Sequence, residues 1–324
     1  MAGDSTAPNK KPIPVGVSAC LLGQEVRFDG GHKRDRYLTG ALSRFFQWVP
    51  VCPEVECGLP IPRPAMRLQS VDGQIRLVTT KDQTDLTDRM REFAQCRVAD
   101  LVSAGLRGFV LKKGSPSCGM ERVKVYAGNG PPRRAGRGLF AAELLARYPN
   151  LPVEEEGRLH DPRLRENWIT RVFAYHSLQS LWNSDRTPRT LRRFHSAYKL
   201  MLLAHSPVGY RHLSRLVDRA ERLSREDLRL MYETIFMTTL SKPVTRAGNT
   251  NVLRHMLGYF KKNIDTPAKK ELLGHIRDYR KGYVPLVVPL TLISHYIRMY
   301  QVHALADQIY LNPYPKDLVP SSEV

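Results

Sequence analysis

The chain lacks an apolar stretch that could cross a membrane. Its longest apolar run, residues 284–293, contains Pro285 and Pro289 and is about half the ~20 residues that a spanning helix needs. Residues 1–14 are largely polar, and no apolar stretch follows them as it would in a secretory signal. We therefore expect a soluble, cytoplasmic protein with no membrane partner.

Cysteine is scarce, with five in 324 residues. An odd number of cysteines without a secretion signal is typical of a reducing compartment, where thiols stay free for metal binding or chemistry. This excludes a disulfide framework as the basis of the fold. Nothing in the sequence implies an obligate protein partner.

Acidic residues are also few relative to basic ones. The 31 Asp and Glu residues against 50 Lys and Arg leave a formal charge of +19 at pH 7. Nucleic acid is the leading candidate partner, since each cation laid on a phosphate releases condensed counterions. A basic protein that is merely well solvated would have the same composition, and charge alone favours neither interpretation.

Residues 13–158 have the pattern of an α/β domain. The candidate strands are short apolar runs bounded by Gly and Pro, at residues 14–19, 47–51, 108–112 and 151–154. Helical spacing extends over residues 86–101, with Gly105 as a stop signal, and again over residues 139–147. Strands alternating with helices predict a Rossmann-like domain with a mostly parallel sheet.

Residues 159–324 predict an all-α domain, and residues 1–12 a flexible tail ahead of the first domain. Ser224 with Asp227 forms a capping box at the start of one helix. Three prolines are expected in the first turns of further helices, Pro207, Pro243 and Pro267.

Three cysteines share one context, because Cys20, Cys52 and Cys118 each follow a predicted strand. Parallel strands end at one edge of a sheet, where open α/β sheets bind ligands. Three thiolates are too few for a closed structural zinc site, but they suit a metal centre with an open coordination position. Zinc and a cubane iron–sulfur cluster both remain candidates. A single cysteine would more simply be a buried apolar residue.

The other two cysteines fit this pattern less well. Cys57 lies five positions after Cys52 and could be a spare ligand, a sulfur acceptor or an apolar filler, of which filler or a supporting role is favoured. Cys96 lies on the flank of the predicted helix, away from the strand ends, and is expected to be a packing residue.

The motifs around these cysteines resemble those of TudS-type thiouracil desulfidases. They are Ser18-Ala-Cys-Leu-Leu-Gly23 with Arg27-Phe-Asp-Gly30, Cys52-Pro-Glu54 with Gly58-Leu-Pro-Ile-Pro-Arg63, and Lys113-Gly-Ser-Pro-Ser-Cys-Gly119. The second half resembles the YbgA-type helical domain through His195-Ser-Ala-Tyr-Lys199, Ala204-His-Ser-Pro207, Asn249-Thr-Asn-Val-Leu253 and Pro285-Leu-Val-Val-Pro-Leu290. The combination is similar to the fused desulfidases called RudS, which act on thiolated uridine in tRNA.

The resemblance implies a [4Fe–4S] cluster on Cys20, Cys52 and Cys118, whose unligated iron captures the substrate sulfur. Glu54 matches the family's catalytic carboxylate. Ser115 matches its other active-site position and is expected to hydrogen-bond that base or relay a proton. The implied reaction is the non-redox, hydrolytic conversion of thiouridine in tRNA, first of all 4-thiouridine, to uridine with release of sulfide. Two other functions stay open, a desulfidase of free thiouracil and a zinc-stabilised RNA-binding module without catalysis.

Basic and aromatic residues interleave in the second half, as suits RNA phosphates and exposed bases. The candidate RNA-binding residues are Lys242, Arg246, Arg254, Lys261 and Lys262, together with Arg133 and Arg134 in a predicted loop that could line the entrance to the site. Residues 242–251 are predicted to form a loop whose backbone donors are free for phosphate. The same pattern also fits helices with aromatic cores and a solvated basic face.

Overall fold

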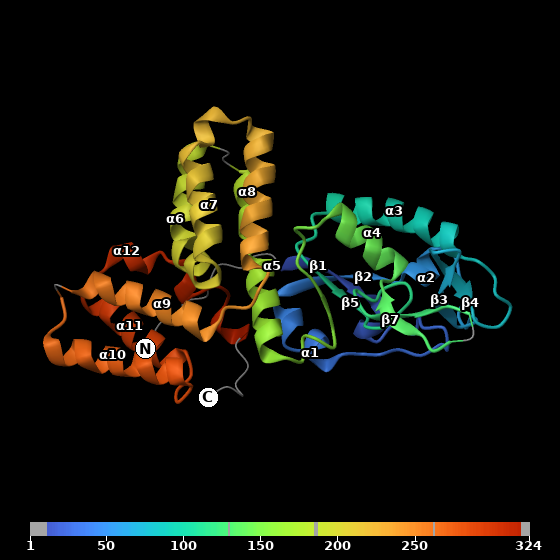
Figure 1. Ribbon diagram of the computed structural model, residues 1–324, viewed down its shortest axis with the longest axis horizontal. Helices are drawn as coiled ribbons and strands as arrows, with labels where there is room; N and C mark the ends of the chain where they lie inside the picture. Colours follow the sequence, from blue (N-terminus) through green and yellow to red (C-terminus); the bar gives the residue numbers. More distant parts are fainter. Residues whose placement is uncertain (1–11, 129, 185–186, 262, 319–324) are drawn as a thin grey trace, which may run out of the picture. The chain divides into compact units, whose positions relative to one another are not determined.

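The computed structural model describes residues 12–128, 130–184, 187–261 and 263–318 (Figure 1). It divides into two compact units, residues 1–168 and 169–324. The predicted tail lies outside the described residues except for its last position. The division falls inside α5 (Pro162–Asn183), about ten residues after the expected boundary, because the start of this helix packs with the first unit. There the Trp168 ring contacts Phe46 at 5.7 Å between centroids and donates a hydrogen bond to the carbonyl of Pro152.

The first unit contains a parallel four-stranded sheet, as the sequence predicted. Its order is β2 (Phe46–Val51), β1 (Ile13–Ser18), β5 (Phe109–Leu111) and β8 (Val153–Glu155). Helices α3 (Thr87–Ser103) and α4 (Leu139–Arg147) pack together on one face of this sheet (Figure 1). Gly105 follows α3 with φ +80°, a conformation that glycine adopts without strain, and so ends the helix as expected.

A glycine in β1 allows the two central strands to pack closely. A Cβ atom on Gly16 would lie 2.2 Å from the ring of Phe109 on β5. The Phe109 side chain is fully buried and fills the space above the glycine. This contact helps to hold β1 beside β5, so that the segments after both strands emerge at the same edge.

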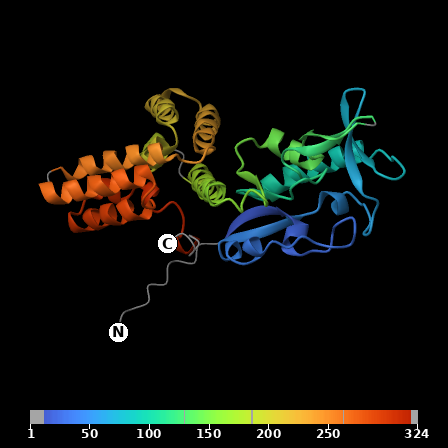
Figure 2. The same cartoon turned by 60° about the horizontal axis from the view of Figure 1, so that its bottom comes forward.

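A second, mixed sheet was not predicted. Its order is β4 (Gln74–Thr79), β3 (Met66–Val71), β6 (Val123–Tyr126) and β7 (Arg133–Gly136), and in Figure 2 the β3–β4 hairpin extends from one end of the unit. Its apolar face packs with α3 and α4 through Leu68, Leu77, Met90, Val123, Val125 and Leu139. The predicted loop at Arg133 and Arg134 is wrong, because these residues form β7, antiparallel to β6. The strand is short and exposed, so no apolar alternation marks it.

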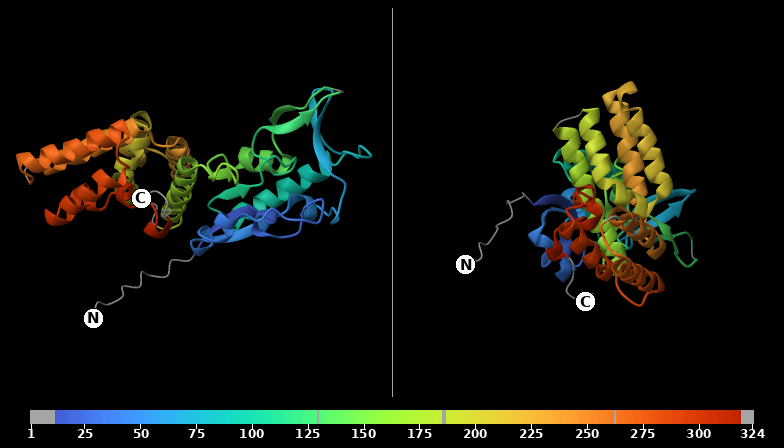
Figure 3. Two further views of the ribbon diagram at one scale, coloured as in Figure 1. Left: turned by 90° about the horizontal axis from the view of Figure 1, so that it is seen from below. Right: turned by 90° about the vertical axis from the view of Figure 1, so that its left-hand side faces the viewer.

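The second unit is helical, with no strand among its described residues, as predicted. Its α-helices after α5 are α6 (Pro188–His205), α7 (Pro207–Asp218), α8 (Arg225–Leu240), α9 (Arg246–Leu257), α10 (Thr266–Lys281), α11 (Val287–Met299) and α12 (His303–Ala306). Helices α6 to α8 lie side by side, and α9 to α11 form a second group (Figure 3). No helix in the described ranges is long and apolar enough to span a membrane.

The helix starts follow the predicted capping signals with one exception. The Ser224 hydroxyl accepts the N–H of Asp227 at 3.1 Å at the start of α8. Pro207 and Pro267 lie in the first turns of α7 and α10. The prediction for Pro243 is wrong, because α9 begins only at Arg246. Thr245 caps this helix, and its side chain accepts a hydrogen bond from the N–H of Gly248.

Candidate active site

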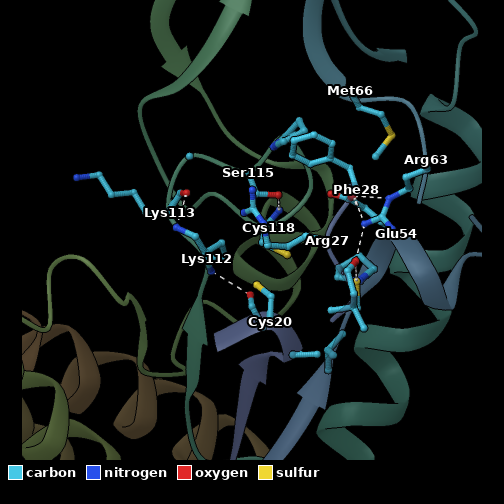
Figure 4. A pocket seen from close by; sticks show the side chains of 18 of the residues that line it. Cys20, Arg27, Phe28, Glu54, Arg63, Met66, Lys112, Lys113, Ser115 and Cys118 are labelled. Atoms are coloured by element: carbon cyan, nitrogen blue, oxygen red, sulfur yellow. Dashed lines mark hydrogen bonds and ion pairs between the residues drawn. The ribbon is translucent and has the colours of Figure 1, made fainter. Parts of the chain in front are cut away.

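A cavity of about 260 Å³ lies where β1, β2 and β5 end, and Cys20, Cys52 and Cys118 all line it. Figure 4 shows Cys20 and Cys118 in this lining. Cys20 lies on the short helix η1 (Ala19–Leu22), which directly follows β1. Cys52 follows β2 and caps α2 (Pro53–Glu56), and Cys118 lies in the loop after β5. The structure therefore brings together three cysteines that are far apart in the sequence.

The loop that carries Cys118 is folded back on itself by Ser115. The Ser115 hydroxyl oxygen accepts the N–H groups of Ser117 at 3.2 Å and Cys118 at 3.1 Å. The start of the loop is tied to β1, because the Lys112 N–H donates to the Ser18 hydroxyl at 2.9 Å. These bonds hold Cys118 at the same end of the sheet as Cys20.

Gly138 supports this loop from behind. Its N–H donates to the carbonyl of Gly119 at 2.8 Å, and a Cβ atom on Gly138 would lie 2.4 Å from the Ser117 carbonyl oxygen. Since the neighbour is backbone, Gly138→Ala must displace the loop, and we expect it to destabilise the fold by about 1–3 kcal/mol. Thermal unfolding measures this. The control Gly274→Ala, in α10 with nothing within 4 Å, should stabilise by about 0.5–1 kcal/mol; equal melting temperatures for both variants would contradict the prediction.

The three thiols influence one another's ionisation. Burial is the main cause that raises the pKa of Cys20 to about 11; Lys112 and Arg27 act to lower this pKa, and the nearby Cys52 acts to raise it. Burial also raises the pKa of Cys118 well above its usual value, with added repulsion from Glu54, Cys52 and Cys20. Without a cation the site thus favours neutral thiols. A bound metal centre would reverse this preference, because a coordinating thiol is deprotonated by the positive charge.

The donor set is three cysteine thiols, the type of ligand that holds an iron–sulfur cluster. Within the described ranges, no three His, Cys, Asp or Glu side chains are grouped closely enough to hold a single ion. The cysteines instead surround the cavity, and a cubane cluster takes one thiolate for each iron, so its ligands are spread around it. Three sulfur ligands leave one iron without a protein ligand. Cys20, Cys52 and Cys118 are the residues that would hold such a group.

The remaining two cysteines do not line the cavity. The Cys57 thiol lies 3.2 Å from the carbonyl oxygen of Glu54 and its side chain packs against the apolar core below the mixed sheet. This contact agrees with the expected filler role. Cys96 is exposed on α3, so the expectation that it packs in the interior is wrong.

Glu54 lines the cavity and is held by two residues that sequence reasoning did not single out. Arg63 donates to Oε2 through Nε at 2.9 Å and through a terminal nitrogen at 2.5 Å. The Ser117 hydroxyl donates to Oε1 at 2.9 Å. The bond expected from Ser115 is thus made by Ser117, although Ser115 also lines the cavity. Both residues lie inside the quoted motifs, which was the available signal.

The candidate RNA-binding residues are scattered. Arg133 and Arg134 are exposed on β7 and do not line the cavity. Lys242 is exposed before α9, whereas Arg246 lies within the first turn of α9 and donates to the carbonyl of Tyr279 at 2.9 Å. The predicted loop over residues 242–251 is therefore wrong from residue 246 onward. Arg254 and Lys261 are exposed at the end of α9 and beyond it, and Lys262 lies outside the described residues.

Comparison with known proteins finds a matching family model in each half of the chain. The family model for 2-thiouracil desulfurase matches residues 15–156, which include every residue that lines the cavity. A model for a protein of unknown function, DUF1722, matches residues 199–315. The uncharacterized Escherichia coli (strain K12) protein YbgA is 36% identical over 155 residues, which cover 48% of this chain and 92% of YbgA. The chain belongs to the YbgA family.

Two further proteins are similar to somewhat less than half of this YbgA-family chain. The uncharacterized Bacillus subtilis (strain 168) protein YbbK is 28% identical over 152 residues, which cover 45% of this chain and 97% of YbbK. Among solved structures, the [4Fe–4S]-dependent thiouracil desulfidase TudS is 36% identical, with 47% of this chain and 95% of that chain covered and a TM-score of 0.38. The 2-thiouracil desulfurase model thus matches most of the first unit, and the DUF1722 model matches most of the second.

Proposed function

We propose that the protein is a [4Fe–4S]-dependent desulfidase that converts 4-thiouridine in tRNA to uridine and releases sulfide. The observation that carries the proposal is the convergence of Cys20, Cys52 and Cys118 with Glu54 around one cavity. The match of residues 15–156 to 2-thiouracil desulfurase supports the same chemistry. Water and the C=S group become C=O and hydrogen sulfide, so the reaction needs no electrons.

The cavity brings three soft sulfur ligands together with a carboxylate. When bound, the cluster would supply an iron with an open position that acts as a Lewis acid on a soft thiocarbonyl sulfur. The carbon is then open to attack by water, and Glu54 is placed to accept a proton from that water as a general base. Arg27, Lys112 and Lys113 also line the cavity, where Arg27 pairs with Asp29 and Lys112 with Glu156. Lys113 adds a cation that favours an anionic substrate such as a nucleotide.

The Ser117 hydroxyl orients this base. Ser117 is completely buried and donates a hydrogen bond to Oε1 of Glu54, and Arg63 donates two hydrogen bonds to Oε2. These bonds fix the plane of the Glu54 carboxylate. Ser115 shapes the Cys118 loop through two backbone N–H groups. We infer that Ser115 acts by placing Cys118, and that Ser117 contacts the base directly.

The helical unit offers a surface suited to RNA. Four exposed side chains lie at the end of α9 or just after it, and we name them together the α9 face: Arg254, His255, Tyr259 and Lys261. Tyr259 is 37% exposed, and its ring meets that of His255 at 5.7 Å between centroids. Cations that hold phosphates beside an exposed aromatic ring that can stack on a base are typical of RNA-binding surfaces.

Reversing charge on the α9 face should weaken the use of tRNA. We expect Arg254→Glu combined with Lys261→Glu to raise KM for thiolated tRNA by about tenfold or more and to lower its salt dependence by roughly one unit of log–log slope for each lost contact. Activity on free thiouracil should not change. The control with the same change of charge is Arg219→Glu combined with Arg222→Glu, two exposed cations at η3 (Ala220–Arg222). An equal effect of the control, or equal loss on the free base, would contradict the assignment.

The function is tested with full-length protein reconstituted without oxygen. Thiolated tRNA and free 2-thiouracil are incubated separately, and the thiolated nucleoside or base is followed by its absorbance and by chromatography after digestion. The proposal expects loss of 4-thiouridine from tRNA. Activity only on the free base selects a thiouracil desulfidase. Tight tRNA binding by a zinc-containing protein without turnover selects an RNA-binding module.

A further inference from the structure

Arg63 lies at the junction of two segments that form the cavity. Its side chain is nearly inaccessible, with 3% exposed. Two of its guanidinium nitrogens donate to Glu54, one of these also donates to the carbonyl of Val26 at 2.8 Å, and the third donates to the carbonyl of Pro60 at 3.3 Å. Each guanidinium nitrogen is therefore engaged within the site.

The Val26–Phe28 segment is attached to Arg63 at both of its ends. Besides the bond to the Val26 carbonyl, the backbone N–H of Arg63 donates to the Phe28 carbonyl at 2.9 Å. All three residues of the segment line the cavity, and the Phe28 residue is 39% exposed. An exposed aromatic ring at the wall of a cavity is suited to stack on a planar base.

We propose that Arg63 is a positioning residue that holds the Glu54 carboxylate and the Phe28 ring in one fixed arrangement. A thiolated pyrimidine stacked on Phe28 then lies within reach of Glu54. Figure 4 shows Phe28, Arg63 and Glu54 on the same side of the cavity. This assignment rests on the proposed desulfidase function and adds to it the residue that sets the geometry of base and substrate.

The hydrogen-bond pattern of Arg63 requires a guanidinium. A planar fork can donate to one carboxylate oxygen twice while its other N–H groups reach two carbonyls, whereas a lysine ammonium is a single point on a flexible stem. Arg63→Lys would keep the positive charge beside Glu54 but could not keep all three partners. Geometry and charge can therefore be separated with one conservative substitution.

Arg97, on α3, provides a control that acts on α2, the helix that carries Glu54. It pairs with Glu56 of α2 at 2.8 Å, and both side chains are about 30% exposed. Neither residue lines the cavity. Arg97→Lys and Arg97→Met therefore test the effect of loosening α2 from outside, without touching Glu54 or the Val26–Phe28 segment.

The first test is a double-mutant cycle on the reconstituted full chain. We expect Arg63→Lys to lower kcat by about tenfold and Arg63→Met by about 100-fold, with iron content unchanged and the Arg97 variants close to wild type. If Arg63 acts through Glu54, Arg63→Met should cost far less in a Glu54→Gln background. Additive losses, or wild-type turnover by Arg63→Lys, overturn the proposal.

The second test needs no turnover. Amide hydrogen exchange should accelerate at residues 26–28 in Arg63→Met and stay at the wild-type rate in Arg97→Met, because the Arg63 side chain bonds the backbone of this segment and the Arg97 side chain bonds Glu56 instead. Unchanged exchange in Arg63→Met overturns the positioning role whatever the activity. Lack of turnover by the wild-type protein on every thiolated substrate would instead refute the proposed desulfidase function.

Discussion

Replacing any one of Cys20, Cys52 and Cys118 with serine should remove iron from the protein and abolish desulfuration. Each thiol lines the cavity, and a serine hydroxyl is a poor ligand for iron compared with a thiolate. We expect iron to fall from about four atoms per chain to nearly none in Cys20→Ser, Cys52→Ser and Cys118→Ser after identical anaerobic reconstitution. Iron and turnover are measured on the same samples.

The other two cysteines supply the controls. Cys96→Ser should keep full iron content, because the thiol is exposed on α3 and remote from the cavity lining. Cys57→Ser should also keep its iron, since the thiol contacts a carbonyl and apolar side chains. Loss of iron from Cys57→Ser would make that residue a fourth ligand and contradict the open coordination position.

Glu54→Gln should leave the iron in place while lowering kcat by about 10²–10⁴-fold, the usual contribution of a positioned general base. Glutamine can still accept the Arg63 hydrogen bonds through its carbonyl oxygen, and its amide nitrogen can donate to the Ser117 hydroxyl oxygen, but it cannot accept a proton from water. The visible absorbance of the cluster reports retention, and sulfide release reports turnover. The loss should appear with tRNA and with free thiouracil alike.

Glu143→Gln is the matched control for Glu54. Glu143 lies on α4, where it pairs loosely with Arg147 at 3.7 Å, and it does not line the cavity. It should behave as wild type in both measurements. A colourless Glu54→Gln protein would contradict the division of roles, because it would show that the carboxylate supports the cluster itself.

The sequence predicted the parallel sheet and the helical half because both have strong periodic signals. β1 and β5 are apolar and buried, and α3 shows helical spacing ended by Gly105. The mixed sheet was missed because its strands alternate weakly, and β7 is exposed along its length. The sequence predicts a loop at residues 246–251 because Gly248 and several polar residues obscure the helical pattern at the start of α9.

The candidate site was predictable where chemistry and strand ends coincide. Three cysteines that each follow a predicted strand are expected to meet at one edge of the sheet, and in the structure all three line one cavity. Arg63 and Ser117 were not identified, because their partnership with Glu54 depends on contacts between residues 9 and 63 positions apart. Such contacts follow from the tertiary fold and leave no periodic pattern in the chain.

Iron and acid-labile sulfide, measured together on full-length protein purified without oxygen, decide most directly whether the three-cysteine cavity holds a cluster. The cysteine geometry predicts about four atoms of each per chain and a loss of both in Cys118→Ser. One zinc atom per chain with neither iron nor sulfide would contradict it.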